Sequence, residues 1–316
     1  MRALELSEGQ LNLRTDYPAA KAPDGSVRVR IIQAGICETD LQLVAGYMGF
    51  QGVPGHEFVG IPQSGQFAGQ RVVGEINCVC HVCSMCQRGL KNHCPNRSVI
   101  GILNHDGAFA DNLIVPECNL HPIDDSISDD LATLVEPVAA AFQIPAQVDL
   151  SPGMRAVVVG DGRLGNLCAQ VLKRLVDHVV VIGKHPTKIE RFRKLDIETC
   201  LLQDLPADLT ADIAVDCAGS PSGFETALRI VRPRGTLVMK TTVAAEHQTT
   251  LAKIVIDEIT VTGSRCGPFT RAIDAIRNQE LDLDQFITAR FPIEDFAAAF
   301  DQAKSPESLK VIIKLS

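Results

Sequence analysis

The chain has 316 residues, of which 46% are hydrophobic and 22% charged, and 38 acidic against 30 basic side chains give a formal net charge of −8. This acidic, ordinary globular composition argues against a disordered chain and a nucleic-acid binder, and no apolar stretch reaches the ~18–20 residues of a membrane span. The length predicts about two domains. The start, MRALELSEGQ, lacks the pattern of a secretory signal, so we expect a cytoplasmic protein.

The pattern of apolar residues changes near residue 150. Before it, short apolar runs at 27–32, 71–76 and 112–117 alternate with Gly and Pro, which predicts an irregular β region. After it, the expected elements in chain order are strand 156–159, helix 164–175, strand 178–182, helix 187–195, strand 212–217, helix 222–231, strands 235–240 and 258–263, and a helix at about 268–279. This alternation predicts an α/β domain with a doubly wound parallel sheet.

The last segment, 284–316, predicts one amphipathic helix and one strand. These two elements could extend the parallel sheet or return to the first region.

Four of the eleven cysteines form the strongest motif, Cys80-x2-Cys83-x2-Cys86-x7-Cys94. Thiols stay reduced in a cytoplasmic protein, and four thiolates at this spacing can enclose one tetrahedral zinc ion. Coincidental loop cysteines and an iron–sulfur cluster are the alternatives. Because a four-cysteine shell leaves no open coordination position, this zinc would be structural.

A second set of residues is dispersed. Cys37 and His56, with Glu57 beside the histidine, are the kinds of residue that bind a catalytic zinc. Taken by themselves, a Cys and a His 19 residues apart are better explained as core residues. Glu136 lies in the apolar stretch LATLVEPVAAAF, where an acid is costly to bury unless it is paired or bound to metal. The alternative for Glu136 is an acid at a helix start.

A glycine motif follows the strand expected at 156–159. Its pattern, Gly160-x-Gly162-x-x-Gly165, opens the next helix, as in dinucleotide-binding turns. The first glycine permits the turn, the second lets the backbone approach a pyrophosphate, and the third allows close packing of helix and strand. The candidate cofactor-binding residues of this turn are Gly160, Gly162, Arg163, Leu164 and Gly165.

The acid that would bind the adenosine ribose of NAD is missing from the end of the second strand. Gly183 stands there, followed by Lys184, His185 and Lys188. A small residue followed by cations suits a 2′-phosphate, so the sequence predicts NADP(H) in preference to NAD(H). The alternative is that these cations form the solvated face of the next helix.

Taken together, these motifs resemble those of the medium-chain zinc-dependent alcohol dehydrogenases, in particular the polyol and threonine dehydrogenase branch. GICETD at 35–40, GHEFVG at 55–60, the four-cysteine segment and VVVGDGRLG at 157–165 occur in the order that the family shows. The resemblance implies a GroES-like catalytic domain, made of 1–145 and 284–316 with a zinc lobe at 78–96, and a Rossmann domain at 146–283. It also implies a homodimer or homotetramer.

The resemblance assigns roles to single residues. Cys37, His56, Glu57 and Glu136 correspond to catalytic zinc ligands, Thr39 to the hydroxyl that accepts the substrate's proton, and Asp40 to an acid that orients the zinc histidine. Two departures are visible. Gln42 replaces the histidine that passes the proton to solvent in many members, and the chain is short between Cys37 and His56 and between Phe58 and Arg71.

We therefore expect two zinc ions per chain and hydride transfer between NAD(P) and a secondary alcohol or ketone: a polyol, an amino alcohol or a sugar-like compound. One alternative is an NAD(P)-binding protein of the same fold that has lost catalysis or works without the second zinc. A zinc ribbon that binds nucleic acid is disfavoured by the acidic chain and by the lack of a basic, aromatic surface near the cysteines.

Overall fold

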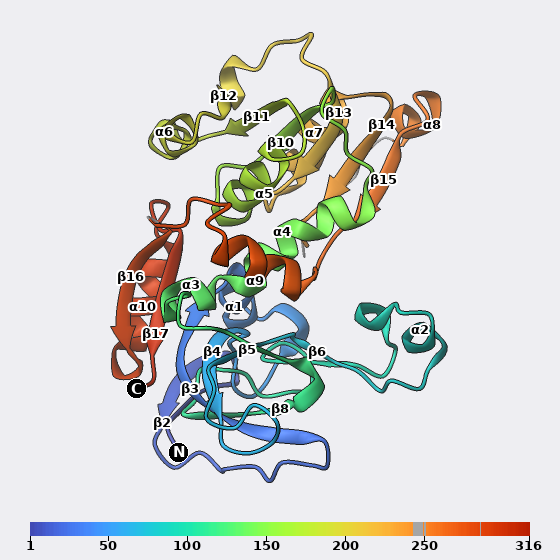
Figure 1. Cartoon of the computed structure of the whole chain (residues 1–316). Coiled ribbons are helices and arrows are strands. Elements are labelled where there is room, and N and C mark those ends of the chain that lie inside the picture. Colours follow the sequence, from blue (N-terminus) through green and yellow to red (C-terminus); the bar gives the residue numbers. More distant parts are fainter. Residues whose placement is uncertain (243–248, 250, 285) are drawn as a thin grey trace. The chain divides into compact units, whose positions relative to one another are not determined.

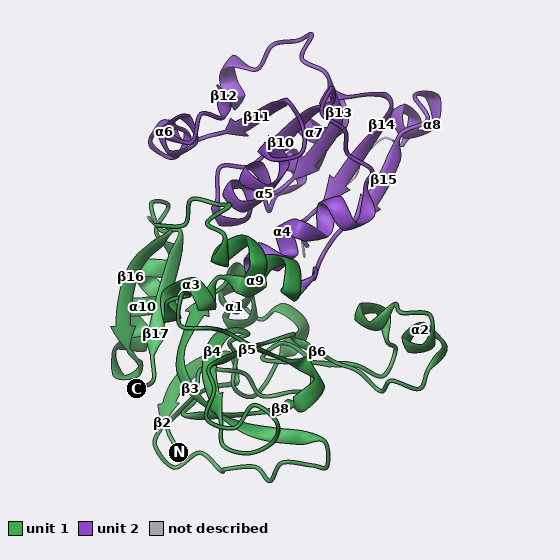
Figure 2. Cartoon of the chain, viewed as in Figure 1, with its two compact units in different colours: residues 1–136, 269–316 green, residues 137–268 purple. Residues whose placement is uncertain are grey.

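A computed structural model describes residues 1–242, 249, 251–284 and 286–316. The chain divides into two compact units, Met1–Glu136 with Phe269–Ser316, and Pro137–Pro268 (Figure 2). These boundaries fall before the expected 145/146 and 283/284. The difference arises because nearly all of α4 (Val135–Gln147) belongs to unit 2, whereas α9 (Phe269–Arg277) belongs to unit 1.

Unit 1 is built on a sheet that is antiparallel except at one edge (Figure 1). The strand order is β16 (Ile287–Pro292), β17 (Lys310–Lys314), β3 (Ser26–Ile36), β4 (Glu57–Pro62), β5 (Val72–Gly74) and β9 (Leu120–Pro122), and β8 (Asn112–Pro116) also pairs with β3. Every second residue from Val27 to Ile31 is buried, so period-2 alternation directs one face of β3 into the core. The sheet confirms the predicted β character of this region.

The smaller elements of unit 1 surround this sheet. They are β1 (Ala3–Ser7), β2 (Gln10–Arg14), α1 (Glu38–Val44), β6 (Asn77–Cys78), α2 (Ser84–Gln87), β7 (Ser98–Val99), α3 (Asp129–Thr133), α9 and α10 (Phe296–Lys304).

The C-terminal segment returns to unit 1. Strand β17 pairs antiparallel with β3, with Val311 opposite Ile36, so the second of the two alternatives for 284–316 is correct. Strand β16 was not predicted; its alternating half-buried and exposed residues carry no strong apolar signal. The return matters because it brings Lys310 beside the end of β3.

Unit 2 contains a parallel sheet, which confirms the Rossmann-type prediction. Its described strands follow the order β12 (Glu198–Leu201), β11 (His178–Gly183), β10 (Arg155–Val159), β13 (Ala211–Asp216), β14 (Val231–Met239) and β15 (Thr260–Gly263), and its helices are α4, α5 (Arg163–Lys173), α6 (Pro186–Lys194), α7 (Pro221–Ile230) and α8 (Ala252–Ile256). Strand β12 is half-exposed and polar at its start, and was not predicted.

The strand order reverses at β10. The next strand in the chain, β11, lies on one side of β10 and β13 lies on the other. In open parallel sheets, ligands bind beyond the carboxyl ends of the strands at such a switch point. The turn after Val159 lies at this point.

No helix in the described ranges is long and apolar enough to cross a membrane.

Candidate functional site

The four cysteines of the predicted lobe come together. Their sulfur atoms lie within 4.8 Å of one another, with Cys94 Sγ 3.5 Å from Cys80 Sγ and 3.8 Å from Cys83 Sγ. Four sulfurs at ~2.3 Å from a zinc ion lie ~3.8 Å apart, so the spacing fits a tetrahedral metal. Cys83 precedes α2, Cys86 lies within it, and Cys94 is fully buried.

The acidity of these thiols is uneven. Hydrogen bonds from the backbone N–H groups of Val82 and Cys83 lower the pKa of Cys80 to about 6. Desolvation and the neighbouring thiols raise the pKa of Cys86 to about 12. Since thiolates are the metal ligands, binding of a metal must release protons from this lobe, and its affinity falls as the pH falls.

A second cluster joins two adjacent strands of unit 1. Cys37 directly follows β3, His56 directly precedes β4, and Glu57 is the first residue of β4, where it pairs with Gly35. The ligand atoms of Cys37, His56 and Glu57 lie within 4.8 Å of one another, and the side chains of His56 and Glu57 are at most 3% exposed. Antiparallel pairing thus brings together the residues that the sequence separates.

The carboxylate of Asp40 contacts the backbone and the histidine of this cluster. Its carboxylate accepts hydrogen bonds from the backbone N–H of Cys37 at 2.8 Å and of Gly55 at 3.1 Å, and it lies 3.5 Å from His56 Nδ1. Burial lowers the pKa of His56, but the charges of Asp40 and Cys37 outweigh burial, so that pKa is raised well above its usual value. A metal must therefore compete with a proton for this imidazole.

The two carboxylate oxygens of Glu57 have different surroundings. The Nζ group of Lys310 on β17 donates a hydrogen bond to Glu57 Oε2 and another to the Ile36 carbonyl at 3.3 Å. The other oxygen, Glu57 Oε1, is buried and has no hydrogen-bond partner among the described residues. A buried carboxylate oxygen without a donor is costly, and a cation at the cluster would satisfy it.

Sequence reasoning missed Lys310. The available signal was a lysine inside the apolar run LKVIIKLS, at a position that is 2% exposed in the structure. Buried lysines are rare unless they are paired with an acid. The return of β17 to β3 supplies the partner, and this return could not be derived from local patterns.

The remaining predicted residues lie outside the cluster of Cys37, His56 and Glu57. Thr39 is half-buried in the first turn of α1, and its hydroxyl is 3.8 Å from Cys37 Sγ. Gln42 is exposed and donates to Glu38. Glu136 is half-buried in the first turn of α4 and does not belong to the cluster of Cys37, His56 and Glu57.

The glycine motif of unit 2 forms the predicted strand–turn–helix. Gly160 adopts φ 128°, and a Cβ at Gly165 would lie 2.1 Å from the Gly160 carbonyl oxygen. A Cβ at Gly162 would meet nothing within 4 Å. The first and third glycines are therefore needed for the turn itself, and the second leaves open space beside the backbone, as a pyrophosphate requires.

A cavity of about 200 Å³ lies against this turn. Its lining includes most of the predicted cofactor-binding residues: Gly160, Gly162, Gly183, Lys184, His185 and Lys188. Arg163 and Leu164 begin α5 and do not line it. Asp161 does line it, and sequence reasoning assigned no role to this residue.

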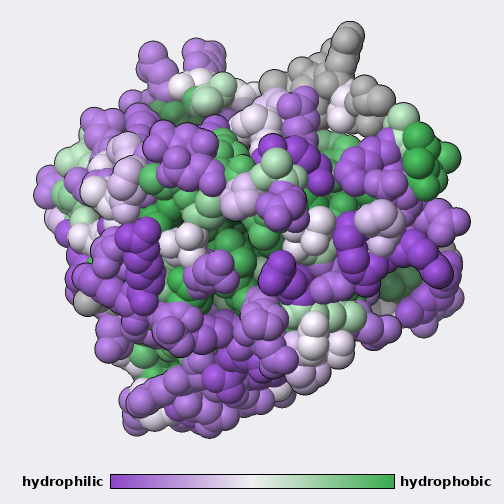
Figure 3. Space-filling view, turned by 90° about the horizontal axis from the view of Figure 1, so that it is seen from above, coloured by the Kyte–Doolittle hydropathy of each residue, from purple (hydrophilic) through white to green (hydrophobic). Residues whose placement is uncertain are grey.

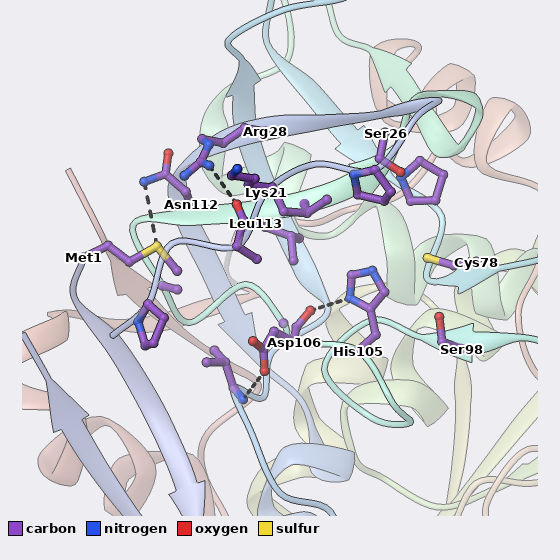
Figure 4. A pocket seen from close by; sticks show the side chains of 18 residues that line it. Met1, Lys21, Ser26, Arg28, Cys78, Ser98, His105, Asp106, Asn112 and Leu113 are labelled. Carbon is purple, nitrogen blue, oxygen red and sulfur yellow. Dashed lines mark hydrogen bonds between the residues drawn. The ribbon is translucent and has the colours of Figure 1, made fainter. Parts of the chain in front are cut away.

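A larger cavity, of about 390 Å³, lies elsewhere in unit 1 (Figure 4). Residues of the N-terminal segment, among them Lys21, and of β8 line it, together with His105 and Asp106. None of the predicted site residues faces it, so size does not identify the functional site in this chain.

Comparisons with known proteins agree with this arrangement. The model of the alcohol dehydrogenase GroES-like domain matches residues 23–125, and that of the zinc-binding dehydrogenase domain matches residues 164–281. The L-threonine 3-dehydrogenase of Salmonella arizonae is 30% identical and the alignment covers 95% of each chain. The chain belongs to the medium-chain zinc-dependent alcohol dehydrogenase family.

Two solved structures share the fold of this dehydrogenase. An alcohol dehydrogenase from Escherichia coli CFT073, complexed with NADH, has a TM-score of 0.91 at 23% identity and covers 100% of this chain and 99% of its own. A zinc-binding dehydrogenase from Sinorhizobium meliloti 1021, bound to NADP, has a TM-score of 0.89 at 23% identity over 99% of each chain. These two structures show the fold alone. The match to the zinc-binding dehydrogenase domain and the 30% identical relative show that the chain is an NAD(P)-dependent dehydrogenase.

The glycine turn of the dehydrogenase can be tested by a matched pair. Gly165→Ala forces a methyl group against the Gly160 carbonyl oxygen and should lower the free energy of unfolding by ~1–3 kcal/mol. Gly162→Ala has open space and a φ of −86°, so it should cost less than ~1 kcal/mol, mainly through a poorer helix N-cap. Denaturant titration measures both; equal losses would contradict the packing role of Gly165.

Proposed function

We propose that this dehydrogenase oxidises a secondary alcohol whose oxygen lies at the Cys37–His56–Glu57 cluster, with NAD(P)⁺ bound at the turn between Val159 and Arg163. The main support for this proposal is a cluster of three metal-ligating side chains, half-buried Cys37 with buried His56 and Glu57, in which one carboxylate oxygen, Glu57 Oε1, has no hydrogen-bond partner among the described residues. The relative at 30% identity acts on L-threonine, which supports an amino alcohol or a polyol as the class of substrate.

The residues of this chain have distinct roles in the proposed reaction. A bound zinc ion would supply a Lewis acid for the alcohol oxygen, and bound NAD(P)⁺ would supply the hydride acceptor. Cys37, His56 and Glu57 would hold this zinc, and Asp40 and Lys310 position two of them. Lys310 occupies Glu57 Oε2 and leaves Oε1 without a donor, so Oε1 is the oxygen that a zinc ion would satisfy. Glu136 is a further acidic ligand that the family resemblance suggests.

Thr39 would accept the proton of the alcohol. It carries the only hydroxyl in GICETD, and its Oγ1 lies 3.8 Å from Cys37 Sγ, beside the metal cluster. Gln42 has no basic group, so the proton would pass from Thr39 Oγ1 to water rather than to a histidine.

The second proposed zinc would be structural. It would be enclosed by Cys80, Cys83, Cys86 and Cys94, which leave no open position for a substrate.

The assembly and location remain predictions. Family membership suggests a homodimer or homotetramer, and Val255 and Ile256 of α8 are more than 70% exposed beside the edge strand β15. The face in Figure 3 is mainly polar, with hydrophobic residues gathered in a few areas. Contact between two copies would cover such residues, which sedimentation analysis can decide. A cytoplasmic location is expected from the sequence alone.

The proposed reaction predicts cofactor reduction with secondary alcohols. A panel of L-threonine, polyols and sugar alcohols, followed at the absorbance of NAD(P)H, should contain at least one substrate. Cys37→Ser should abolish that turnover because it removes a zinc ligand, whereas Cys118→Ser, which changes an exposed thiol outside both clusters, should retain it. Turnover that survives in Cys37→Ser would overturn the proposed site.

The two metal clusters predict different losses. Native mass spectrometry of the wild-type chain should show two zinc ions. Cys83→Ser should lose one zinc and much of its thermal stability, because structural zinc sites contribute ~10–16 kcal/mol of apparent binding free energy in small peptides. Cys37→Ser should lose the other zinc with a smaller change in melting temperature. A single zinc in the wild type, or the same stability loss in both variants, would contradict this division.

The proton path predicts a selective loss of turnover. Thr39→Val should retain zinc and cofactor binding but lower kcat by ~10²–10⁴-fold, the usual contribution of a positioned proton transfer. Thr39→Ser keeps the hydroxyl and should recover most of the rate. If Thr39→Val turned over as fast as Thr39→Ser, the proton would leave by another route.

A further inference from the structure

The carboxylate of Asp161 lies at the end of strand β11 although the residue belongs to the turn after β10. Asp161 Oδ2 accepts hydrogen bonds from the backbone N–H groups of Lys184 and His185, both at 2.8 Å. His185 Nδ1 lies 2.9 Å from Oδ2 and 3.1 Å from Oδ1, and Lys188 Nζ lies 3.9 Å from Oδ1. Only 8% of Asp161 is exposed, so a preformed group of donors holds it.

The Asp161 carboxylate occupies the space that the side chain of an acid at the end of β11 would fill. A Cβ built on Gly183 would lie 2.6 Å from Asp161 Oδ2 and 2.7 Å from Asp161 Cβ. Gly183 is therefore required by the neighbouring side chain: any larger residue would displace Asp161. Residue 183 carries no acidic side chain, and Asp161, in the turn after the adjacent strand β10, supplies a carboxylate in its place.

The prediction of NADP(H) depended on space beside Gly183 and on free cations after it. The structure contradicts the first premise, because the Asp161 carboxylate fills the space. It weakens the second, because the side chains of His185 and Lys188 already face this carboxylate, while Lys184 contacts it through its backbone N–H. These donors are the groups that a 2′-phosphate would need. An anion already bound to them repels a second anion, whereas a neutral ribose hydroxyl can donate to it.

We propose that Asp161 determines cofactor selectivity: its carboxylate accepts the adenosine ribose hydroxyls and excludes the 2′-phosphate, so that this dehydrogenase prefers NAD(H) to NADP(H). The inference rests on the proposed function, since it places the adenosine half of the cofactor in the cavity of about 200 Å³ that Asp161 and Gly183 line. The two solved neighbours, one with NADH and one with NADP, leave the choice open.

Calorimetric titration of the full chain with NADH and NADPH tests the proposal without turnover. The wild type should bind NADH at least ~10-fold more tightly. Asp161→Asn keeps the size of the side chain but removes its charge, and should shift the ratio of the two affinities toward NADPH by ~10-fold or more. Asp161→Gly vacates the donors of Lys184 and His185 and should shift it further. Asp177→Asn, at an exposed acid before β11, should leave the ratio unchanged.

A swap of positions provides a second test. Gly183→Asp alone brings two carboxylates together and should weaken binding of both cofactors. Asp161→Gly combined with Gly183→Asp moves the carboxylate to the strand end and should recover the NADH preference. Circular dichroism and thermal denaturation establish that each variant is folded.

The outcomes separate the two proposals. Tighter binding of NADPH by the wild type, or an unchanged ratio in both Asp161 variants, would overturn the role of Asp161 and leave the proposed function standing. Binding of neither cofactor to the folded wild type would overturn the proposed function itself.

Discussion

The buried carboxylate of Asp40 is the interaction on which the metal cluster depends. It accepts N–H groups from the Cys37 segment and from Gly55, and thereby ties the end of β3 to the start of β4. Loss of this carboxylate would leave the buried N–H of Gly55 unsatisfied, at a cost of ~1–3 kcal/mol, and would also remove the hydrogen bond from the part-buried N–H of Cys37. The cluster is thus positioned by backbone hydrogen bonds within the sheet and not by the ligand side chains alone, which is how a site stays preorganised before a metal arrives.

Unit 2 also contains a buried acid that is hydrogen-bonded to backbone N–H groups. Asp161, like Asp40, is a buried acid that accepts hydrogen bonds from two backbone N–H groups. Both donors to Asp161 belong to the segment after β11, whereas the donors to Asp40 are Cys37, three residues before it, and Gly55. In unit 1 the Asp40 carboxylate orients metal-ligating residues. In unit 2 the Asp161 residue lines the cavity beside the glycine turn. Each unit thereby carries an acidic side chain that backbone hydrogen bonds hold where the proposed chemistry needs one.

Much of this arrangement could be predicted from the sequence. The four cysteines, the Cys37 and His56 motifs and the turn of Gly160 to Gly165 carry local spacing that the chemistry requires, and the structure brings each group together. The alternation of strands and helices after residue 150 was sufficient for the parallel sheet. Strands β12 and β16 escaped prediction because their residues are half-exposed and lack continuous apolar runs.

Two residues of the candidate sites, Lys310 and Asp161, could not be predicted from the sequence, and the physical cause is the same for both. Lys310 and Asp161 act through partners, Glu57 and the Lys184 and His185 backbone, that only tertiary pairing brings near. In both cases a glycine lies beside the acidic side chain and leaves room for it. A Cβ at Gly35 would lie 2.7 Å from Glu57 Oε2, and a Cβ at Gly183 would lie 2.6 Å from Asp161 Oδ2. Neither glycine has a positive φ, so neither is needed for a turn. At both positions another side chain occupies the space of the missing Cβ, and at Gly183 this reverses the meaning of the missing acid.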